Sequence, residues 1–309
     1  MAASPDPDSS TTLRHAPRGL CRWLALAAWL LLAGGGAAAE AAPACGGPVP
    51  CEVPGGRYLA LPPPGEAAGR PRAATLFFHG YRSSAADFAA DKAFTDAFAA
   101  EGVLLVLPDG LNGSWSFHGS PSSARDELAF ADAVRRDLIA RWQVDPARIL
   151  VTGFSLGAAM AWELACRRSD DYRAFVAVAG AFWEPLPTRC DGGPVDLLQL
   201  HGTADPVVPM TGRAVGAHWH QGDVLASLGL LAAEDGCPTP PVPGSPVPGP
   251  SNAATDGTLA CEIWSGCADG YRLALCRHPG GHVLPAGWVA LAHAWARSLP
   301  DHVAGHDGG

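Results

Sequence analysis

Short apolar segments alternate with amphipathic segments along most of this chain, and this alternation limits its possible folds more than any other feature. The apolar segments lie at 75–78, 103–107, 149–152, 175–179 and 197–200. Stretches with helical spacing, such as Ala85–Ala100 and Arg125–Trp142, separate them. Strands that are apolar on both faces and alternate with helices predict an α/β fold with a mostly parallel, doubly wound sheet.

The composition supports a globular protein and excludes one broad class of function. Hydrophobic residues make up 48% of the 309 residues and charged residues 17%, so the chain can bury a sizeable core. Its formal net charge is −9. Binding to nucleic acid depends on clustered cations that contact phosphates, so nucleic acid is not expected as a partner.

The N-terminal region has the parts of a secretory signal peptide. Basic residues at Arg14, Arg18 and Arg22 precede the apolar run Trp23–Ala33, and the small residues of Ala37–Ala39 follow it. We therefore predict a signal peptide over 1–39 and a secreted protein, either extracellular or periplasmic, without stable membrane insertion after cleavage. An uncleaved anchor is the alternative, although the run is shorter than the roughly 20 residues that span a bilayer.

The remainder is predicted to be one catalytic domain, 40–300, followed by a short tail, 301–309. Residues 238–251 contain seven prolines and two glycines, which predict an exposed loop insert without regular structure. We expect no large cap domain on the fold.

Cysteine usage also indicates export. One cysteine lies in the leader, and an even number in an exported chain predicts disulfides. Sequence alone allows many pairings. An expected turn favours Cys45–Cys51, a helix end before a strand favours Cys166–Cys190, and an expected hairpin favours Cys261–Cys276, which leaves Cys237–Cys267. A zinc site is the competing interpretation, and no C-x-x-C pair supports it.

The segment Gly153-Phe154-Ser155-Leu156-Gly157 lies between a predicted strand and an Ala-rich helix. This G-x-S-x-G pattern is typical of a tight strand-to-helix turn that lifts a nucleophilic serine above the sheet. The motif alone is weak evidence for a nucleophile in a chain with 37 glycines, and its position between a strand and a helix is the stronger evidence. The alternative is an ordinary loop serine.

A serine nucleophile needs a base and an acid that orients the base, which in this fold follow in the order Ser, Asp or Glu, His. Asp205 follows the apolar strand 197–200, and His282 lies in a glycine-rich loop before the last predicted helix. The sequence therefore predicts Ser155, Asp205 and His282 as catalytic residues. A turn aspartate and a solvated loop histidine are the alternatives.

Two further groups are assigned to the site. The backbone N–H groups of Tyr81 and Leu156 are predicted to form the oxyanion hole, with His79 supporting the loop. Trp115, Phe117 and Trp183 are candidate substrate-binding residues, because they follow predicted strands. Core packing is the alternative for these aromatic residues.

Several segments beside the triad carry a resemblance to a known family. They are Gly56–Tyr58, Phe77–Tyr81, Leu107–Gly110, Val144–Arg148 and Met160, within a match from about Cys45 to Leu299. The chain resembles secreted α/β-hydrolases of the polyhydroxybutyrate depolymerase and feruloyl esterase type. The resemblance implies an α/β-hydrolase fold and the same three catalytic residues. It is incomplete after His282, where Leu284-Pro285-Ala286 replaces the family's usual Trp-Pro-Gly.

These observations predict a serine carboxylic ester hydrolase that forms an acyl-enzyme on small or oligomeric esters. A peptidase or acyltransferase on the same triad, or an inactive hydrolase fold used for binding, are the alternatives. No cofactor and no metal are expected. The pair His218 and His220 lacks a recognisable set of further ligands, and Asp126 and Glu127 are interpreted as a solvated or capping pair.

Overall fold

The computed structural model describes residues 45–65, 72–238, 242–243, 259–264 and 266–302. The predicted signal peptide and tail, except Asp301 and His302, lie outside these ranges. Within them, no helix is both long enough and apolar enough to cross a bilayer.

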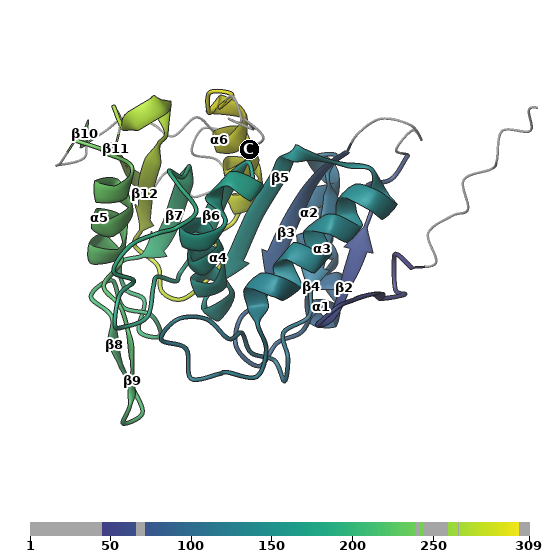
Figure 1. The fold of residues 1–309 in the computed structure, drawn as a ribbon, viewed down its shortest axis with the longest axis horizontal. Helices are drawn as coiled ribbons and strands as arrows, with labels where there is room; N and C mark the ends of the chain where they lie inside the picture. Colours follow the sequence, from purple (N-terminus) through teal and green to yellow (C-terminus); the bar gives the residue numbers. More distant parts are fainter. Residues whose placement is uncertain (1–44, 66–71, 239–241, 244–258, 265, 303–309) are drawn as a thin grey trace, which may run out of the picture. The chain divides into compact units, whose positions relative to one another are not determined.

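A ten-stranded mixed sheet forms the centre of the domain (Figure 1). In spatial order its strands are β1 (Cys51–Val53), β2 (Gly56–Leu61), β4 (Leu104–Pro108), β3 (Arg72–Phe78), β5 (Val144–Phe154), β6 (Ala174–Val178), β7 (Leu197–Gly202), β12 (Leu273–His278), β11 (Ala260–Trp264) and β10 (Val242–Pro243). The strands from β4 to β12 are parallel, and the strands at both edges are antiparallel. This confirms the predicted doubly wound α/β fold.

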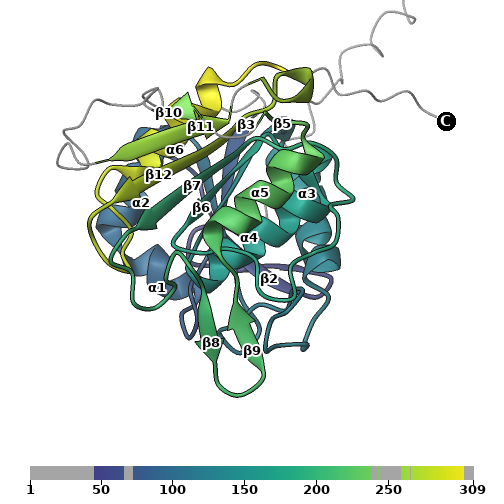
Figure 2. The same ribbon diagram turned by 90° about the vertical axis from the view of Figure 1, so that its left-hand side faces the viewer.

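Helices cover both faces of the sheet (Figure 2). They are α1 (Ala85–Ala90), α2 (Lys92–Ala100), α3 (Glu127–Trp142), α4 (Leu156–Arg167), α5 (Val224–Glu234) and α6 (Trp288–Ser298). Buried residues of α3, α4 and α5 pack in one apolar core, and those of α1, α2 and α6 in another. Successive side chains of β3 enter the two cores in turn, as the pleat of a strand requires: Leu76 and Phe78 enter the first, and Phe77 the second.

The expected helix over Ala85–Ala100 is divided into α1 and α2 at Asp91. Asp91 has an extended backbone, and its side chain accepts a hydrogen bond from the N–H of Phe94. It therefore ends the first helix and caps the second, which periodicity alone does not reveal.

The proline-rich segment contains a short strand, so the expectation of a loop without regular structure is wrong at two positions. Val242 and Pro243 form β10, which pairs with Ile263 and Glu262 of β11. An edge strand tolerates proline, because one side of the strand needs no hydrogen-bond donor. The other residues of the segment between 239 and 258 lie outside the described ranges.

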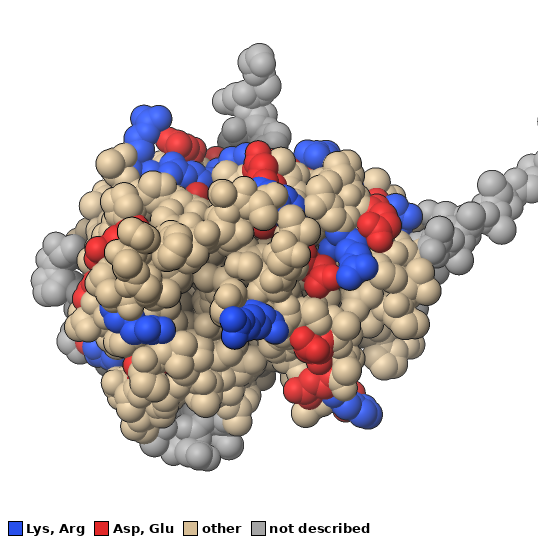
Figure 3. Space-filling view, turned by 90° about the horizontal axis from the view of Figure 1, so that it is seen from below, with Lys and Arg blue, Asp and Glu red and all other residues tan. Residues whose placement is uncertain are grey.

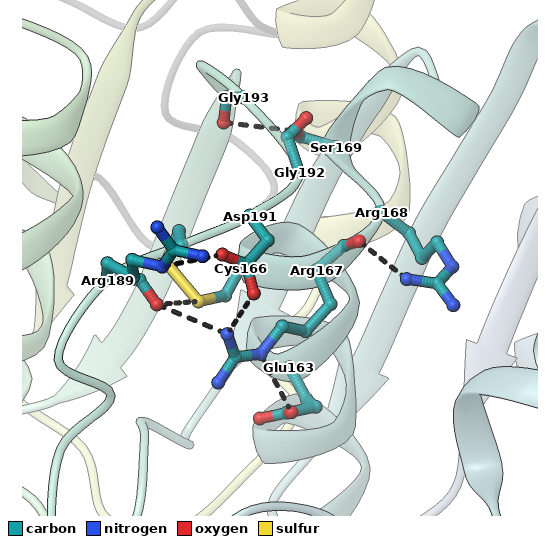
Figure 4. Close-up of a disulfide and its surroundings, with 10 residues drawn as sticks. Glu163, Cys166, Arg167, Arg168, Ser169, Arg189, Asp191, Gly192 and Gly193 are labelled. Atoms are coloured by element: carbon teal, nitrogen blue, oxygen red, sulfur yellow. Dashed lines mark hydrogen bonds and ion pairs between the residues drawn. A yellow bond between two sulfur atoms is a disulfide. The ribbon is translucent and has the colours of Figure 1, made fainter.

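The described part of the chain contains four disulfides: Cys45–Cys51, Cys166–Cys190, Cys237–Cys267 and Cys261–Cys276. These are the four pairs that the sequence predicts. Cys261 and Cys276 lie directly opposite each other on β11 and β12. At the end of α4, Cys166–Cys190 lies beside Arg167, which pairs with Glu163 and Asp191 (Figure 4).

Candidate active site

The nucleophile turn connects β5 to α4, and two glycines make it possible. Ser155 has φ 59° and ψ −120°, a conformation rare for residues other than glycine. A Cβ at Gly153 would overlap the backbone of Gly157, and a Cβ at Gly157 would overlap the carbonyl oxygen of Phe78. The N–H of Ser155 donates to the carbonyl oxygen of Val178, 2.9 Å away. Close backbone packing and this backbone hydrogen bond therefore hold Ser155 in a partly buried turn.

The structure brings the three predicted catalytic side chains together. Nε2 of His282 lies 2.9 Å from Oγ of Ser155, and Nδ1 of His282 lies 2.7 Å from Oδ2 of Asp205. The ring of His282 packs against the ring of Phe154, with centroids 4.8 Å apart. Asp205 is separated from Ser155 by 50 positions and His282 by 127, so only the fold can bring them together.

Neighbouring parallel strands explain why Asp205 and His282 meet. Asp205 follows β7, His282 follows β12, and these strands pair with Gly202 opposite His278. Two backbone bonds continue the pairing beyond the strand ends: Thr203 N–H donates to His278, and Ala204 N–H to Gly280. The acid and base loops therefore leave the same edge of the sheet side by side.

The carboxylate of Asp205 is buried and has a defined orientation. Its Oδ1 accepts hydrogen bonds from the N–H groups of Val207 and Val208, at 2.8 and 2.9 Å. Its Oδ2 faces His282, whose side chain keeps 15% of its surface exposed. A carboxylate fixed in this way holds one imidazole nitrogen and leaves the other directed at Ser155.

A fully buried histidine that no sequence motif marks, His201, supports the same loop. His201 Nδ1 accepts a hydrogen bond from Nε2 of Gln199 at 2.8 Å, so its Nε2 carries the proton and donates to the carbonyl oxygen of Val208 at 2.8 Å. Trp162 in turn donates to Oε1 of Gln199. Burial lowers the pKa of His201, which favours this neutral form. In the sequence, only the position of His201 at the end of the strand before Asp205 indicates this supporting role.

The loop after β3 lies beside the nucleophile. A Cβ added to Gly80 would lie 3.6 Å from Cβ of Ser155. His79 donates from Nδ1 to the carbonyl oxygen of Gly80 and accepts at Nε2 from the N–H of Gly110. Burial lowers the pKa of His79, consistent with a neutral ring that holds the loop.

The two predicted oxyanion donors border this arrangement. Leu156 is the first residue of α4, so its N–H belongs to the unpaired first turn at the positive end of the helix dipole. Tyr81 directly follows Gly80, and its N–H makes no hydrogen bond within the described part of the chain. Both N–H groups are thus available beside Ser155.

Trp115 cannot line a substrate site, so this prediction is wrong. Its side chain is fully buried, its ring packs on those of Phe78 and His79, and its Nε1 donates to the carbonyl oxygen of His79. Phe117 and Trp183 form an edge-to-face pair with centroids 6.2 Å apart. Phe117 is half-buried and Trp183 is 6% exposed, so their contact with substrate stays a prediction.

The remaining polar candidates have structural partners. Asp126 caps α3, but Glu127 is buried, contrary to a solvated pair, and forms a 2.6 Å ion pair with Arg125. His220 lies 3.3 Å from Glu184. Within the described ranges, no group of three or more His, Cys, Asp and Glu side chains is arranged to hold a metal ion.

Known proteins with similar sequences include carboxylesterases and feruloyl esterases. A family model described as phospholipase/carboxylesterase matches residues 117–221, which include Ser155 and Asp205. Feruloyl esterase C of Emericella nidulans is 30% identical over 189 residues, covering 60% of this chain and 59% of that protein. A putative esterase, NocK of Nocardia uniformis subsp. tsuyamanensis, is 33% identical over 148 residues, covering 47% and 42%. The chain thus spans about three fifths of the first relative.

Among solved structures, an acetyl xylan esterase from Aspergillus awamori has a TM-score of 0.55 over 78% of this chain and 93% of that one. At 13% identity, this likeness concerns the fold alone. The chain therefore has an α/β-hydrolase fold, and the relatives that it resembles in sequence carry esterase names.

Proposed function

We propose that this protein is a serine hydrolase of carboxylic esters, with Ser155 as nucleophile, His282 as base and Asp205 as the acid that orients it. The hydrogen-bonded chain from Asp205 through His282 to Ser155, with distances of 2.7 and 2.9 Å, carries the proposal. The similarity to carboxylesterases and feruloyl esterases favours esters over amides as substrates.

The proposed reaction has two halves. In the first, Oγ of Ser155 attacks the ester carbonyl carbon while its proton passes to Nε2 of His282, and the N–H groups of Tyr81 and Leu156 stabilise the oxyanion. His282 then gives the proton to the departing alcohol, which leaves an acyl-serine. In the second half, water attacks the acyl-serine, again through His282, and releases the acid and the free serine.

Two finer assignments belong to the same proposal. The similarity to feruloyl esterases makes feruloyl esters the first natural substrates to test, with hydroxyalkanoate oligomers as the alternative. Four disulfides favour an oxidising compartment and therefore an exported protein, consistent with the basic and apolar pattern of 1–39.

A substrate panel tests this function. We expect turnover of p-nitrophenyl acyl esters and feruloyl esters, no comparable turnover of peptide amides, and a fall in kcat of about 10³-fold or more in Ser155→Ala. Preferred cleavage of amides, or transfer of the acyl group to an added alcohol in place of water, would support the peptidase or acyltransferase alternative. Unchanged ester turnover in folded Ser155→Ala would overturn the proposal.

A further inference from the structure

The described arginines differ in whether a carboxylate pairs with them, and two of those without such a pair lie on segments connected to the candidate active site. Most described arginines form an ion pair with a carboxylate: Arg57, Arg125, Arg135, Arg141, Arg167, Arg168, Arg173, Arg189, Arg277 and Arg297. Arg82 and Arg213 are exposed, and neither forms an ion pair with any described residue. Arg82 lies on the loop after β3, next to Tyr81, and Arg213 begins a short strand that is hydrogen-bonded to the Asp205 loop.

Arg82 directly follows Tyr81, the proposed oxyanion donor. Its φ of 60° is left-handed, a conformation that an arginine adopts at an energetic cost, and its N–H donates to the carbonyl oxygen of Gly113 at 2.8 Å. Its guanidinium lies over the ring of Tyr81, 5.2 Å from the ring centroid. Tyr81 is itself 60% exposed, so the pair presents an aromatic ring and a cation to solvent.

Arg213 is the first residue of β8 (Arg213–Val215). Its Nε donates to the carbonyl oxygen of Val207 at 2.7 Å, and the N–H of Val207 donates to Asp205. One edge of the guanidinium is thus anchored to the loop of the catalytic acid. Its two terminal nitrogens make no hydrogen bond to the described residues, which leaves them free for a carboxylate.

Nearby carboxylates do not neutralise these two cations. Asp205 binds His282, and Asp109 binds Arg57. Asp87 accepts hydrogen bonds from Ser84 in the cap of α1. Figure 3 views the domain from the side toward which the parallel strands point, and blue side chains flank a hollow near the middle of this face while most red side chains lie toward its margins.

An acidic protein needs local cations to attract an anionic substrate. The net charge of −9 repels anions at long range, so two arginines without a carboxylate partner, one next to Tyr81 and one bonded to the Asp205 loop, favour an anionic ligand. We propose that Arg82 and Arg213 bind a carboxylate carried by the substrate, so that the preferred esters are those with a free carboxylate near the scissile bond. This inference rests on the proposed esterase function and narrows its substrate class.

Matched pairs of esters test the inference. For the acyl side, the pair is p-nitrophenyl hydrogen adipate and p-nitrophenyl methyl adipate, which differ only in the charge and methylation of the distant carboxyl group. For the alcohol side, the pair is 3-carboxyphenyl hexanoate and 3-carbamoylphenyl hexanoate. The measured quantity is the ratio of kcat/KM for the anionic ester to that for the neutral ester. Each variant is compared with wild type, so intrinsic reactivity cancels.

We expect the ratio to fall in at least one pair by about threefold to fivefold in Arg82→Gln and in Arg213→Gln, and by about tenfold or more in the double variant. Arg136→Gln is the matched control, because Arg136 is also exposed and forms no ion pair with a described residue but lies on α3. Its ratio should equal that of wild type. The pair that responds identifies the side of the ester that carries the carboxylate.

Salt dependence gives a second measurement that needs no variant. In wild type, the ratio should fall between about 20 mM and about 0.5 M NaCl, because salt screens exposed charge pairs. If salt, Arg82→Gln, Arg213→Gln and the double variant all leave the ratio unchanged while the neutral esters are still hydrolysed, the inference is overturned. If wild type hydrolyses none of the four esters at Ser155, the proposed function itself fails, so the two failures are distinguishable.

Discussion

The two sides of the candidate site are held by different kinds of contact. On one side, the Ser155 turn is fixed by backbone packing around Gly153 and Gly157, and Ser155 makes no capping hydrogen bond with its side chain. On the other, the Asp205 loop is fixed by hydrogen bonds, including the bond from His201 to Val208. The first side should therefore be sensitive to added volume, and the second to the loss of charge or of a donor.

The largest effect is expected from Asp205→Asn. The substitution keeps the volume and removes the charge, so His282 loses the group that selects its tautomer and stabilises its protonated form. We expect kcat to fall by about 10³–10⁴-fold, measured with p-nitrophenyl esters at saturating substrate. A fall of less than about tenfold in a folded variant would mean that Asp205 does not act through His282.

Gly157→Ala should break the packed side. The added methyl group would overlap the carbonyl oxygen of Phe78, which belongs to the sheet and cannot move aside cheaply. We expect the free energy of unfolding to fall by about 4 kcal/mol or more, or the protein not to fold.

Gly229→Ala is the matched control for that substitution. Gly229 lies within α5, and an added Cβ there meets no atom within 4 Å. This change should leave stability equal or raise it by about 0.5–1 kcal/mol, because alanine favours helix. Equal denaturant midpoints for Gly157→Ala and Gly229→Ala would contradict the steric account.

Asp235 provides a comparison with Asp205, because it is a buried carboxylate outside the site. It caps the C-terminal end of α5, and burial raises its pKa to about 7 from an ordinary value of 3.8. Between these pH values the folded state keeps a proton that the unfolded state loses. The contribution of Asp235 to the free energy of unfolding is therefore largest below about pH 4, decreases as the pH rises to about 7, and is constant above that pH.

Asp235→Asn removes this pH dependence. The variant should exceed wild type in free energy of unfolding by about 2–4 kcal/mol at pH 8, with little difference at pH 4, measured by urea unfolding at both values. A difference that is the same at both pH values would show that ionisation of Asp235 is not its cause.

The smallest effect is expected from His201→Asn, which removes the donor to Val208 but keeps the Asp205 carboxylate. We expect a loss of about 1 kcal/mol in stability and a fall of about tenfold in kcat, with KM changed less, because the carboxylate is less precisely oriented. If His201 positions the Asp205 carboxylate, kcat and the free energy of unfolding should both fall, and Ser155 should remain the nucleophile. Loss of stability with wild-type kcat would limit His201 to a structural role.

The difference between the packed Ser155 turn and the hydrogen-bonded Asp205 loop also explains what the sequence could predict. The close approach of Gly153 to Gly157 acts within five residues, so the motif and its position between strand and helix could be identified, although the contact of Gly157 with Phe78 could not. The order of Ser155, Asp205 and His282 and the strands before the last two also allowed the triad to be assigned. The pairing of Cys261 with Cys276 followed from the expected hairpin.

Side-chain contacts that no repeating pattern marks limited the remaining predictions. The sequence places an aromatic residue, Trp115, after a predicted strand, but only its packing against Phe78 and His79 shows that it is buried. The role of His201 depends on Val208 and on the chain of bonds from Trp162 through Gln199. The capping of α2 by Asp91 depends on a side-chain hydrogen bond that no repeating pattern marks.

The central claim is that Ser155 is activated by His282 and Asp205, and covalent labelling tests it most directly. Wild-type protein treated with a fluorophosphonate probe, digested and analysed by mass spectrometry should carry one adduct, on the peptide that contains Ser155. The labelling rate should fall sharply in His282→Ala. An adduct on another serine, or labelling of Ser155 at an unchanged rate in folded His282→Ala, would contradict the account.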